Sequence, residues 1–333
     1  MNLDGKTILV TGGTGSFGTC FTETVLREFK PKKLIIFSRD ELKQYEMAQR
    51  FDPAVHKCLR YFIGDVRDEA RLDMAMREVD VVVHAAALKH VPIAEYNPFE
   101  CIKTNVIGAQ NVVSAAIKRG VKHVVALSTD KAASPINLYG ASKLASDKIF
   151  TAAQAMGGGN GPVFSVVRYG NVVGSRGSVV PFFKKLVAEG ADHLPITDER
   201  MTRFWITLPQ GVNFVLSALG MAKGGEVFVP RIPSMATVDL ARSIAPELPH
   251  KVVGIRPGEK LHEVMVPEDD ARTTVEIDDR YVILPGHDAR VREAWLADGA
   301  LPVAEGFAYA SNTNPERLDA RALQSLLQAR LAG

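Results

Sequence analysis

The chain of 333 residues has only three cysteines, at positions 20, 58 and 101. They are too few and too scattered for a disulfide framework or a metal site, so we interpret them as small apolar residues and expect no metal. Long hydrophobic runs are also missing: none reaches the ~18 residues of a membrane span, and the first six residues lack the apolar region of a signal peptide. We therefore expect a cytoplasmic protein with no membrane partner.

Neither sign of charge is in clear excess, because 40 lysines and arginines nearly balance 38 aspartates and glutamates. The formal net charge is +2, so no overall field indicates nucleic acid or an acidic membrane as a partner. Hydrophobic residues make up 46% and charged residues 23% of the chain, which are ordinary globular values. A chain of this length can bury a sizeable core, as one large α/β domain with or without a smaller lobe.

Short apolar segments alternate with helical patterns up to about residue 171. The expected strands cover residues 7–10, 33–37, 59–63, 81–84 and 121–127, and a further one ends at 167. This alternation predicts an α/β fold with a Rossmann-type, doubly wound parallel sheet. We assign residues 1–171 to a dinucleotide-binding domain.

The pattern changes after residue 171. Residues 172–203 and 231–285 are expected to form a smaller substrate-binding lobe over the carboxyl ends of the strands. Segments near 204–230 are expected to return to the sheet, and residues 286–333 form a C-terminal tail.

Within these later parts the local patterns predict several elements. A helix is expected in 199–222, and another over 238–245 with Thr237 as its N-cap. The turn at 255–260 is expected to lead into a short helix. The tail is expected to end in an amphipathic helix over about 318–331.

A glycine-rich segment follows the first strand and opens the first helix. It fits both G-x-G-x-x-G, starting at Gly13, and G-x-x-G-x-x-G, starting at Gly12. Glycine allows the tight turn and a close approach of a pyrophosphate, which the N-terminus of the following helix attracts. A merely tight turn is the alternative, but the strand-to-helix context is the one that a dinucleotide site requires. The candidate cofactor residues are Gly12, Thr14, Gly15, Ser16, Phe17 and Gly18.

The second strand ends in Ser38-Arg39-Asp40, with Lys43 one turn later. Folds that prefer NAD usually place an acidic residue here, to hold the ribose 2′-hydroxyl. Ser38 leaves room and Arg39 supplies a planar cation for a 2′-phosphate, so we predict NADP. Asp40 leaves NAD open, and an ordinary surface role for Arg39 is the alternative.

Further candidate cofactor contacts follow the third and fourth strands. Asp65 could accept a hydrogen bond from an adenine amino group, although a plain turn residue would look the same. The small residues 85–87 allow a flat ligand to lie on the backbone, whereas His84 is interpreted as a hydrogen-bonded core histidine. A buried Asn105 could tie its helix to the central strands or serve a water chain. The candidates in these segments are Asp65, Val66, Ala85, Ala86, Ala87 and Asn105.

The segment Ser128-Thr129-Asp130-Lys131 lies where a predicted strand ends, the place where open α/β sheets bind ligands. Tyr139 and Lys143 follow, four residues apart on one face of a predicted helix. A lysine beside a tyrosine lowers the pKa of the phenol, which makes Tyr139 a usable acid/base near neutral pH. An isolated Tyr-x-x-x-Lys is more often a solvated pair, so this prediction depends on the other motifs.

Together these motifs resemble the extended short-chain dehydrogenase/reductase superfamily from residue 6 to about 285. Within it, the chain looks like the inverting UDP-N-acetylglucosamine 4,6-dehydratases. The stretches that carry this second resemblance are Phe37–Gln44, Ala86–Pro92, Thr129–Lys131, Arg168–Val172 and Gly174–Ser178. The tail segment Gly306–Asn314 also resembles the form that begins pseudaminic acid synthesis.

The resemblance makes Lys131 the most discriminating residue. Retaining dehydratases carry Asp-Glu where this chain has Asp130-Lys131, and simple epimerases and reductases lack the pair. It implies that Lys131, with a lowered pKa, is the base at C5 of the sugar and that Asp130 is the acid. A plain ion pair between the two is the alternative.

The resemblance also implies roles for the other site residues. Tyr139 would take the O4 proton, Lys143 would contact the nicotinamide ribose, and Thr129 would hydrogen-bond the forming carbonyl. The substrate would be UDP-N-acetylglucosamine and the cofactor NADP. The candidate substrate contacts are Lys89, Asn171, Arg203, Arg256 and Glu259.

Two alternative functions stay open. One is another nucleotide-sugar enzyme of this fold, such as a 4-epimerase, and the other is a non-catalytic NADP-binding regulator. The complete set of Thr129, Tyr139 and Lys143 argues against a regulator, which does not need it. Relatives commonly pair through two long helices, here about 98–118 and 138–155, so we expect a homo-oligomer, either a dimer or a hexamer built from dimers.

Overall fold

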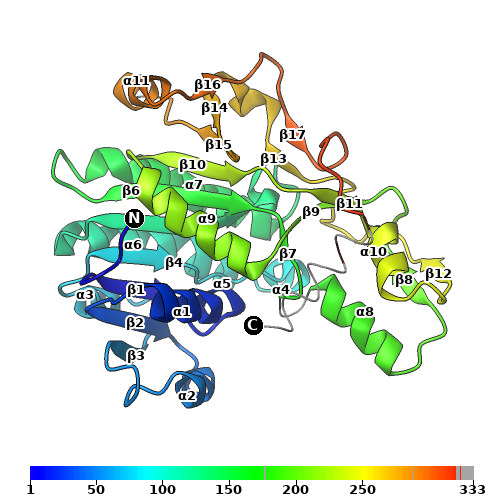
Figure 1. Ribbon diagram of the computed structural model, residues 1–333, viewed down its shortest axis with the longest axis horizontal. Coiled ribbons are helices and arrows are strands. Elements are labelled where there is room, and N and C mark those ends of the chain that lie inside the picture. Colours follow the sequence, from blue (N-terminus) through cyan, green and yellow to red (C-terminus); the bar gives the residue numbers. More distant parts are fainter. Residues whose placement is uncertain (176–177, 287, 320–322, 324–333) are drawn as a thin grey trace.

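A ten-stranded sheet runs through the centre of the computed structural model, which describes residues 1–175, 178–286, 288–319 and 323 (Figure 1). Its strand order is β16-β14-β15-β10-β6-β5-β4-β1-β2-β3, and the seven strands from β10 to β3 are parallel. The strands are β1 (Thr7–Thr11), β2 (Lys33–Ser38), β3 (Leu59–Ile63), β4 (Val81–His84), β5 (His123–Thr129), β6 (Val163–Tyr169), β10 (Glu226–Pro230), β14 (Thr274–Ile277), β15 (Arg280–Ile283) and β16 (Leu301–Pro302). The order 3-2-1-4-5-6 confirms the predicted Rossmann-type sheet.

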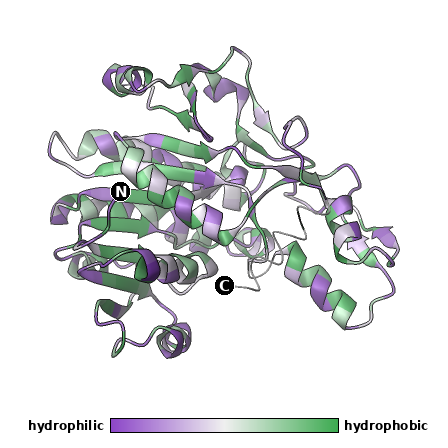
Figure 2. Cartoon of the chain, in the orientation of Figure 1, coloured by the Kyte–Doolittle hydropathy of each residue, from purple (hydrophilic) through white to green (hydrophobic). Residues whose placement is uncertain are grey.

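Helices cover both faces of this sheet. α1 and α9 pack against each other on one face, and α3, α6 and α7 lie on the other (Figure 1). The helices are α1 (Ser16–Glu28), α2 (Glu41–Arg50), α3 (Glu69–Ala75), α4 (Val91–Tyr96), α5 (Pro98–Ile102), α6 (Gly108–Arg119), α7 (Leu138–Met156), α9 (Leu208–Met221) and α11 (Ala289–Ala297). Because both faces are covered, β1 and β4 are buried along their whole length, and the central strands are coloured as hydrophobic in Figure 2.

The predicted helix over 98–118 is interrupted in its middle by a π-helical turn, Lys103–Ile107, between α5 and α6. This turn contains Asn105, which is 1% exposed. The Asn105 side chain accepts from Leu88 N at 2.8 Å, and its Nδ2 donates to Leu88 O and to Ser142 Oγ, each at 2.9 Å. Asn105 therefore ties the loop after β4 to α7, and π-helical turns often occur at functional sites.

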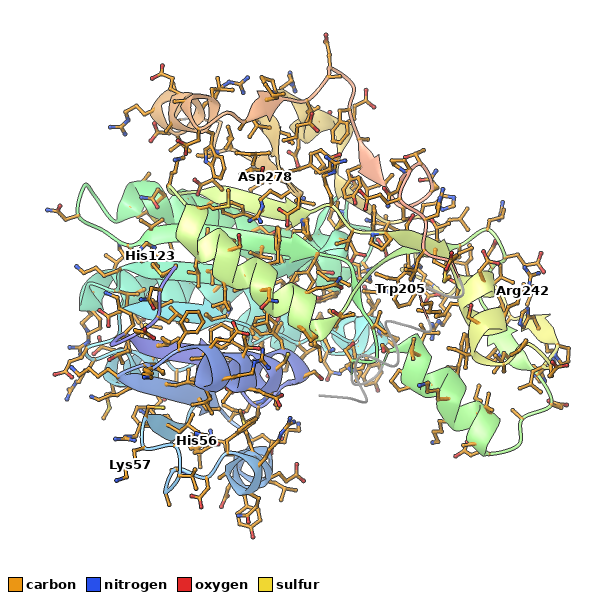
Figure 3. The ribbon with its side chains drawn as sticks, viewed as in Figure 1. His56, Lys57, His123, Trp205, Arg242 and Asp278 are labelled. Atoms are coloured by element: carbon orange, nitrogen blue, oxygen red, sulfur yellow. The ribbon has the colours of Figure 1, made fainter. Side chains whose placement is uncertain are left out.

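The remaining elements form small sheets beside the carboxyl ends of the parallel strands. These sheets have the orders β11-β9-β7, β12-β8 and β13-β17. Their elements are β7 (Asn171–Val172), α8 (Val179–Ala188), β8 (Leu194–Ile196), β9 (Thr202–Ile206), β11 (Ser234–Ala236), α10 (Thr237–Ile244), β12 (His250–Val252), β13 (Val264–Val266) and β17 (Tyr309–Ala310). Trp205, labelled in Figure 3, is 1% exposed and belongs to the buried cluster that holds this lobe together.

Three local predictions in this lobe were wrong. The helix predicted within 199–222 begins only at Leu208, where a capping box between Thr207 and Gln210 marks its N-terminus, and residues 202–206 form strand β9 instead. Thr237 is the first residue of α10 rather than its N-cap, and the N-cap Ala236 makes no side-chain bond. Strand β13, rather than a helix, follows the turn at 255–260, because it pairs with β17 of the tail.

The division of the later chain also differs from the expected one. Strands β14 and β15, which lie within the predicted lobe segment 231–285, extend the large sheet: β15 pairs antiparallel with β10, and β14 pairs antiparallel with β15. The predicted tail helix over 318–331 falls almost entirely outside the described residues. Within the described part of the chain, no helix is both long and apolar enough to cross a bilayer.

Candidate active site

A cavity of about 1070 Å³ lies at the carboxyl ends of the parallel strands, where the small lobe meets the sheet. The predicted cofactor and substrate residues all line it, with the exception of Asn105. Four of the five predicted catalytic residues line it as well, and the fifth, Asp130, is fully buried next to Lys131. The fold thus brings together residues that are scattered over most of the chain.

The glycine loop forms one end of the cavity. Gly12 has a φ of +64°, and a Cβ there would lie 2.8 Å from the backbone of Ala86. Gly15 is the N-cap of α1 and offers no side-chain acceptor to the N–H groups of the first turn. A backbone that only glycine permits, next to a helix N-terminus without a side-chain cap, fits the pyrophosphate of a dinucleotide.

The end of β2 presents cations to the cavity. The carboxylate of Asp40 caps α2, accepting from Lys43 N at 3.0 Å and pairing with Lys43 Nζ at 2.9 Å. The hydrogen bonds from Lys43 lower the pKa of Asp40. Because Asp40 is engaged by its own helix, Arg39, which is 62% exposed, is the more available group at this strand end.

The neighbouring polar groups are held in place by one another. Ser38 Oγ and Thr14 Oγ1 lie 2.8 Å apart and share a hydrogen bond. Asp65 accepts from Arg67 Nε at 3.0 Å and from its terminal nitrogen at 2.7 Å, and Arg39 lies 3.7 Å away. Burial acts to raise the pKa of Asp65, but the bonds from Arg67 outweigh it and the pKa is lowered. An anionic Asp65 can therefore still accept from a ligand.

The sugar end of the cavity is built where β5 meets α7. Asn137 caps α7 by accepting from Gly140 N at 2.7 Å. A Cβ on Gly140 would lie 2.2 Å from Lys131 O, so only glycine lets α7 approach the turn η2 (Asp130–Ala132) this closely. This contact sets Tyr139 beside the residues that end β5.

Tyr139, Thr129 and Lys143 all line the cavity, but the pKa of the phenol differs from the prediction. Burial raises the pKa of Tyr139 to about 12, against the charge of Lys131 and a hydrogen bond with Thr129, which lower it. Lys143 Nζ donates to Leu127 O at 2.7 Å, and burial lowers its pKa. The groups that lower the pKa of Tyr139 are Lys131 and Thr129 rather than the predicted Lys143, and desolvation of the phenolate outweighs them in this buried position.

Lys131 lies between two buried carboxylates. Its Nζ is 3.0 Å from Asp130, 3.3 Å from Glu263, and 3.4 Å from the amide oxygen of Asn171. Burial acts to lower the pKa of Lys131, but Asp130 and Glu263 outweigh it and the pKa is raised. The predicted lowered pKa of this lysine is therefore wrong for this arrangement of charges.

Sequence reasoning missed Glu263, which is 2% exposed, directly before β13. Its carboxylate lies 3.7 Å from Lys260 and 3.8 Å from Arg203. In the sequence, Glu263 is one of several charged residues between Arg256 and β13, followed directly by an apolar strand. This position could have suggested a buried acid, but no local pattern shows that the side chain faces Lys131.

Three predicted substrate residues lie in or against this segment. Arg203 donates to the carbonyl oxygens of Thr202, Lys260 and Leu261, so it fixes the segment that carries Glu263. Arg256 pairs with Glu259 at 2.6 Å and is 69% exposed. Asn137 Nδ2 donates to Gly258 O at 2.7 Å and fastens this loop to α7.

The last predicted substrate residue, Lys89, lines the cavity from the loop after β4, and burial lowers its pKa. Among the described residues, no three His, Cys, Asp or Glu side chains gather in a way that could hold a metal ion. The site therefore combines a cradle for a dinucleotide with a buried acid/base cluster.

Comparison with known proteins agrees with this arrangement. Residues 8–285 match the family described as polysaccharide biosynthesis protein. The chain is 58% identical over 318 residues to the inverting UDP-N-acetylglucosamine 4,6-dehydratase of Campylobacter jejuni subsp. jejuni serotype O:23/36 (strain 81-176), covering 94% of each chain.

Solved structures agree as well. Pen from Bacillus thuringiensis superimposes with a TM-score of 0.89 at 35% identity, covering 99% of this chain and all of that one. DesIV, a dTDP-glucose 4,6-dehydratase from Streptomyces venezuelae with NAD and TYD bound, superimposes with a TM-score of 0.68 at 25% identity, covering 77% and 86%. The chain belongs to the polysaccharide biosynthesis protein family within the extended short-chain dehydrogenases/reductases.

Proposed function

We propose that the protein is an NADP-dependent, inverting UDP-N-acetylglucosamine 4,6-dehydratase. The observation that carries the proposal is the ion pair between Lys131 and the fully buried Asp130. Lys131 lines the same cavity as Thr129, Tyr139 and Lys143, and the other end of that cavity fits a dinucleotide. An epimerase or a reductase needs Thr129, Tyr139 and Lys143, but it does not need Asp130 and Lys131. The 58% identity to a relative of that name supports the same conclusion.

NADP is the proposed cofactor, and the charges at the end of β2 support it. Arg39 and Lys43 line the cavity beside the small Ser38, while the carboxylate of Asp40 is engaged in capping α2. A 2′-phosphate would meet cations here rather than a carboxylate. When bound, this cofactor supplies the acceptor that takes hydride from C4 of the sugar and returns it to C6.

Oxidation at C4 requires removal of the O4 proton, which we assign to Tyr139. The phenol has a raised pKa of about 12, so it needs a path for its own proton. Thr129 offers one, since it shares a hydrogen bond with Tyr139 and donates to Asp130 Oδ1 at 2.8 Å. The chain from Tyr139 through Thr129 to Asp130 can therefore move a proton away from the reacting oxygen.

Elimination follows because the new ketone acidifies the hydrogen at C5. Lys131 is assigned as the base that removes this proton, and Asp130 as the acid that protonates the departing C6 hydroxyl. The carbon at C5 is then planar, and protonation on the face opposite to the original hydrogen inverts it. Arg256 and Lys89, which line the cavity, are proposed to meet the diphosphate.

The proposal is tested by incubating the protein with UDP-N-acetylglucosamine in heavy water and following the product by NMR. We expect UDP-2-acetamido-2,6-dideoxy-β-L-arabino-hex-4-ulose with deuterium at C5, no net reduction of NADP, and transfer of the C4 hydrogen to C6. A D-xylo product at early times would contradict inversion. A product that keeps its oxygen at C6 and differs only at C4 would identify a 4-epimerase instead.

We also propose that the protein acts in the cytoplasm as a dimer, or as a hexamer built from dimers, that pairs through α5, α6 and α7. Exposed apolar side chains on α4 and α5 support this, because Tyr96 is 88% and Phe99 is 77% exposed. The resemblance of 306–314 to the form that begins pseudaminic acid synthesis supports a role for the product in that synthesis. A monomer that persists at every concentration in light scattering would contradict the assembly.

A further inference from the structure

Glu263 is a buried acid that faces the proposed base. The carboxylate comes from the segment before β13, reaches Lys131 Nζ at 3.3 Å, and is 2% exposed. Asp130 approaches the same ammonium group at 3.0 Å. The amino group that must remove the C5 proton is therefore shared by two carboxylates that lie far apart in the chain.

The tail of the chain holds Glu263 in position. Ser311 N donates to Glu263 O at 2.8 Å, and Glu263 N donates to Ser311 Oγ at 3.0 Å. Ser311 Oγ also lies 2.7 Å from Thr202 Oγ1, on strand β9. The N–H and the carbonyl group of Glu263 are thus both bonded to Ser311, which is itself held by β9. The segment before β13, the tail and β9 together fix the position of Glu263.

One carboxylate oxygen of Glu263 is free to carry a proton. Its Oε2 is buried and has no hydrogen-bond partner among the described residues, although Lys260 Nζ lies 3.7 Å from it. Its Oε1 faces Lys131. Burial, followed by the charge of Asp130, raises the pKa of Glu263, so the carboxyl form is favoured more than for an ordinary glutamate.

Lys131 cannot act as a base while it is an ammonium ion. Two carboxylates stabilise its charged form, and bulk water is a poor acceptor for a proton in a site that the sugar fills. A neighbouring group that accepts the proton would resolve this. The charged or titratable groups that face the pair are Asp130 on η2, Arg203 on β9, Lys260 on the same segment as Glu263, and Tyr139 on α7.

We propose that Glu263 is a proton-holding residue that acts through Lys131, which rests on the function proposed above. When the sugar excludes water, one N–H proton of Lys131 moves to the Glu263 carboxylate, which leaves a neutral amine and a neutral carboxyl group. The amine lone pair then forms a bond to the C5 proton while the C5–H electrons expel the C6 hydroxyl, which leaves as water with the proton that Asp130 received from O4 through Tyr139 and Thr129. Lys131 gives the C5 proton to solvent, and Glu263 then returns its own proton to the lysine. A solvent-derived proton adds to C5 on the opposite face when the hydride returns to C6.

The test compares the unmodified protein with Glu263→Gln, which keeps the shape and removes the proton acceptor. We expect kcat at neutral pH to fall roughly 100-fold while KM stays within about 3-fold, because the role lies in the proton chemistry. As pH rises to about 9.5, solvent base removes the lysine proton and kcat of the variant should recover roughly 10-fold relative to the unmodified protein. Reduced nicotinamide should also accumulate, since C4 oxidation is intact and elimination is slow.

Two further variants separate proton holding from folding. Glu263→Asp keeps a carboxyl group and should retain the pH profile of the unmodified protein with an intermediate kcat, even where Glu263→Gln folds poorly. Glu226→Gln is the matched control, because Glu226 is also fully buried with a raised pKa but bonds to Trp295, away from the cavity. It should leave kcat and the pH profile unchanged, whatever it costs in stability.

The possible failures are distinguishable. If the unmodified protein forms no 4-keto-6-deoxy product, the proposed function and this inference both fall. If it does form the product, and Glu263→Gln keeps kcat within about 3-fold or loses the same factor at every pH without accumulating reduced nicotinamide, only the inference is overturned.

Discussion

The two ends of the cavity use different physical means. The dinucleotide end is made of glycine, small residues and backbone N–H groups, and its cations, such as Arg39, are exposed to solvent. The sugar end instead buries Asp130, Glu263 and Arg203 at 0%, 2% and 8% exposure around Lys131. Shape and backbone geometry suffice to bind a cofactor. Proton transfer needs charges whose burial shifts their pKa values, and such burial has to be stabilised by opposite charges.

Replacing the proposed base should have the largest effect, and it should lower dehydration activity without changing cofactor binding. In Lys131→Ala we expect kcat for dehydration to fall by roughly 10³-fold or more, while cofactor binding changes little, because the lysine lies at the other end of the cavity. In Tyr139→Phe the initial oxidation should slow instead. Product NMR and cofactor titration measure both, and a Lys131→Ala protein with near-normal turnover would show that the lysine is only an ion-pair partner.

A small change in the glycine loop should weaken cofactor binding at the dinucleotide end and leave the residues of the sugar end unchanged. In Gly12→Ala the new methyl group would lie within 3 Å of the Ala86 backbone, at a residue whose φ is +64°. We expect cofactor affinity to fall roughly 10- to 100-fold, from about 1–3 kcal/mol of strain and steric conflict. Gly5→Ala is the control, since Gly5 has a φ of +68° but nothing within 4 Å of the added carbon. Equal losses in both would refute a specific role for the close approach.

Cofactor choice tests whether exposed charges matter at that same end. Arg39→Asp should lower the affinity for NADP roughly 10- to 100-fold and leave NAD binding within a few-fold, because only the 2′-phosphate meets the changed group. Arg50→Asp, an exposed arginine on α2 that pairs with Glu23, is the matched control. Fluorescence titration with each dinucleotide gives the answer, and equal affinities in the unmodified protein would contradict NADP preference.

The last comparison concerns His84, a buried group beneath the dinucleotide end, and its effect is on stability rather than on binding or turnover. Its Nδ1 lies 2.8 Å from Thr11 Oγ1, and burial, aided by Lys143, lowers its pKa to about 3. An unfolded histidine binds a proton near pH 6.5 and the folded one does not, so its contribution to stability is lost progressively as pH falls below that value. At pH 5 the loss is about 2 kcal/mol. In His84→Asn, urea unfolding should show a correspondingly smaller drop in stability between about pH 7.5 and pH 5; an unchanged drop would exclude this histidine as the cause.

Local sequence patterns were sufficient for the dinucleotide half. The glycine loop, the apolar strands and the Tyr139–Lys143 spacing depend on neighbours within a turn or two of chain, and the structure has all of them as predicted. Apart from the interrupted helix over 98–118 and the pKa values of Lys131 and Tyr139, the errors fall in the later segments, where pairing partners come from elsewhere. Strand β13 pairs with β17 of the tail, and β15 pairs with β10, and no local pattern reveals those partners.

The amino-acid sequence by itself determined which chemical groups the site contains, because residue types and short spacings specify a strand end, a helix face or a glycine turn. Only the tertiary structure decided their electrostatics. It brings Glu263 to Lys131, raises the pKa of both, and raises that of Tyr139 through burial. A pKa depends on every charge and on all the solvent excluded within several ångströms, and those neighbours are set by the packing of distant segments.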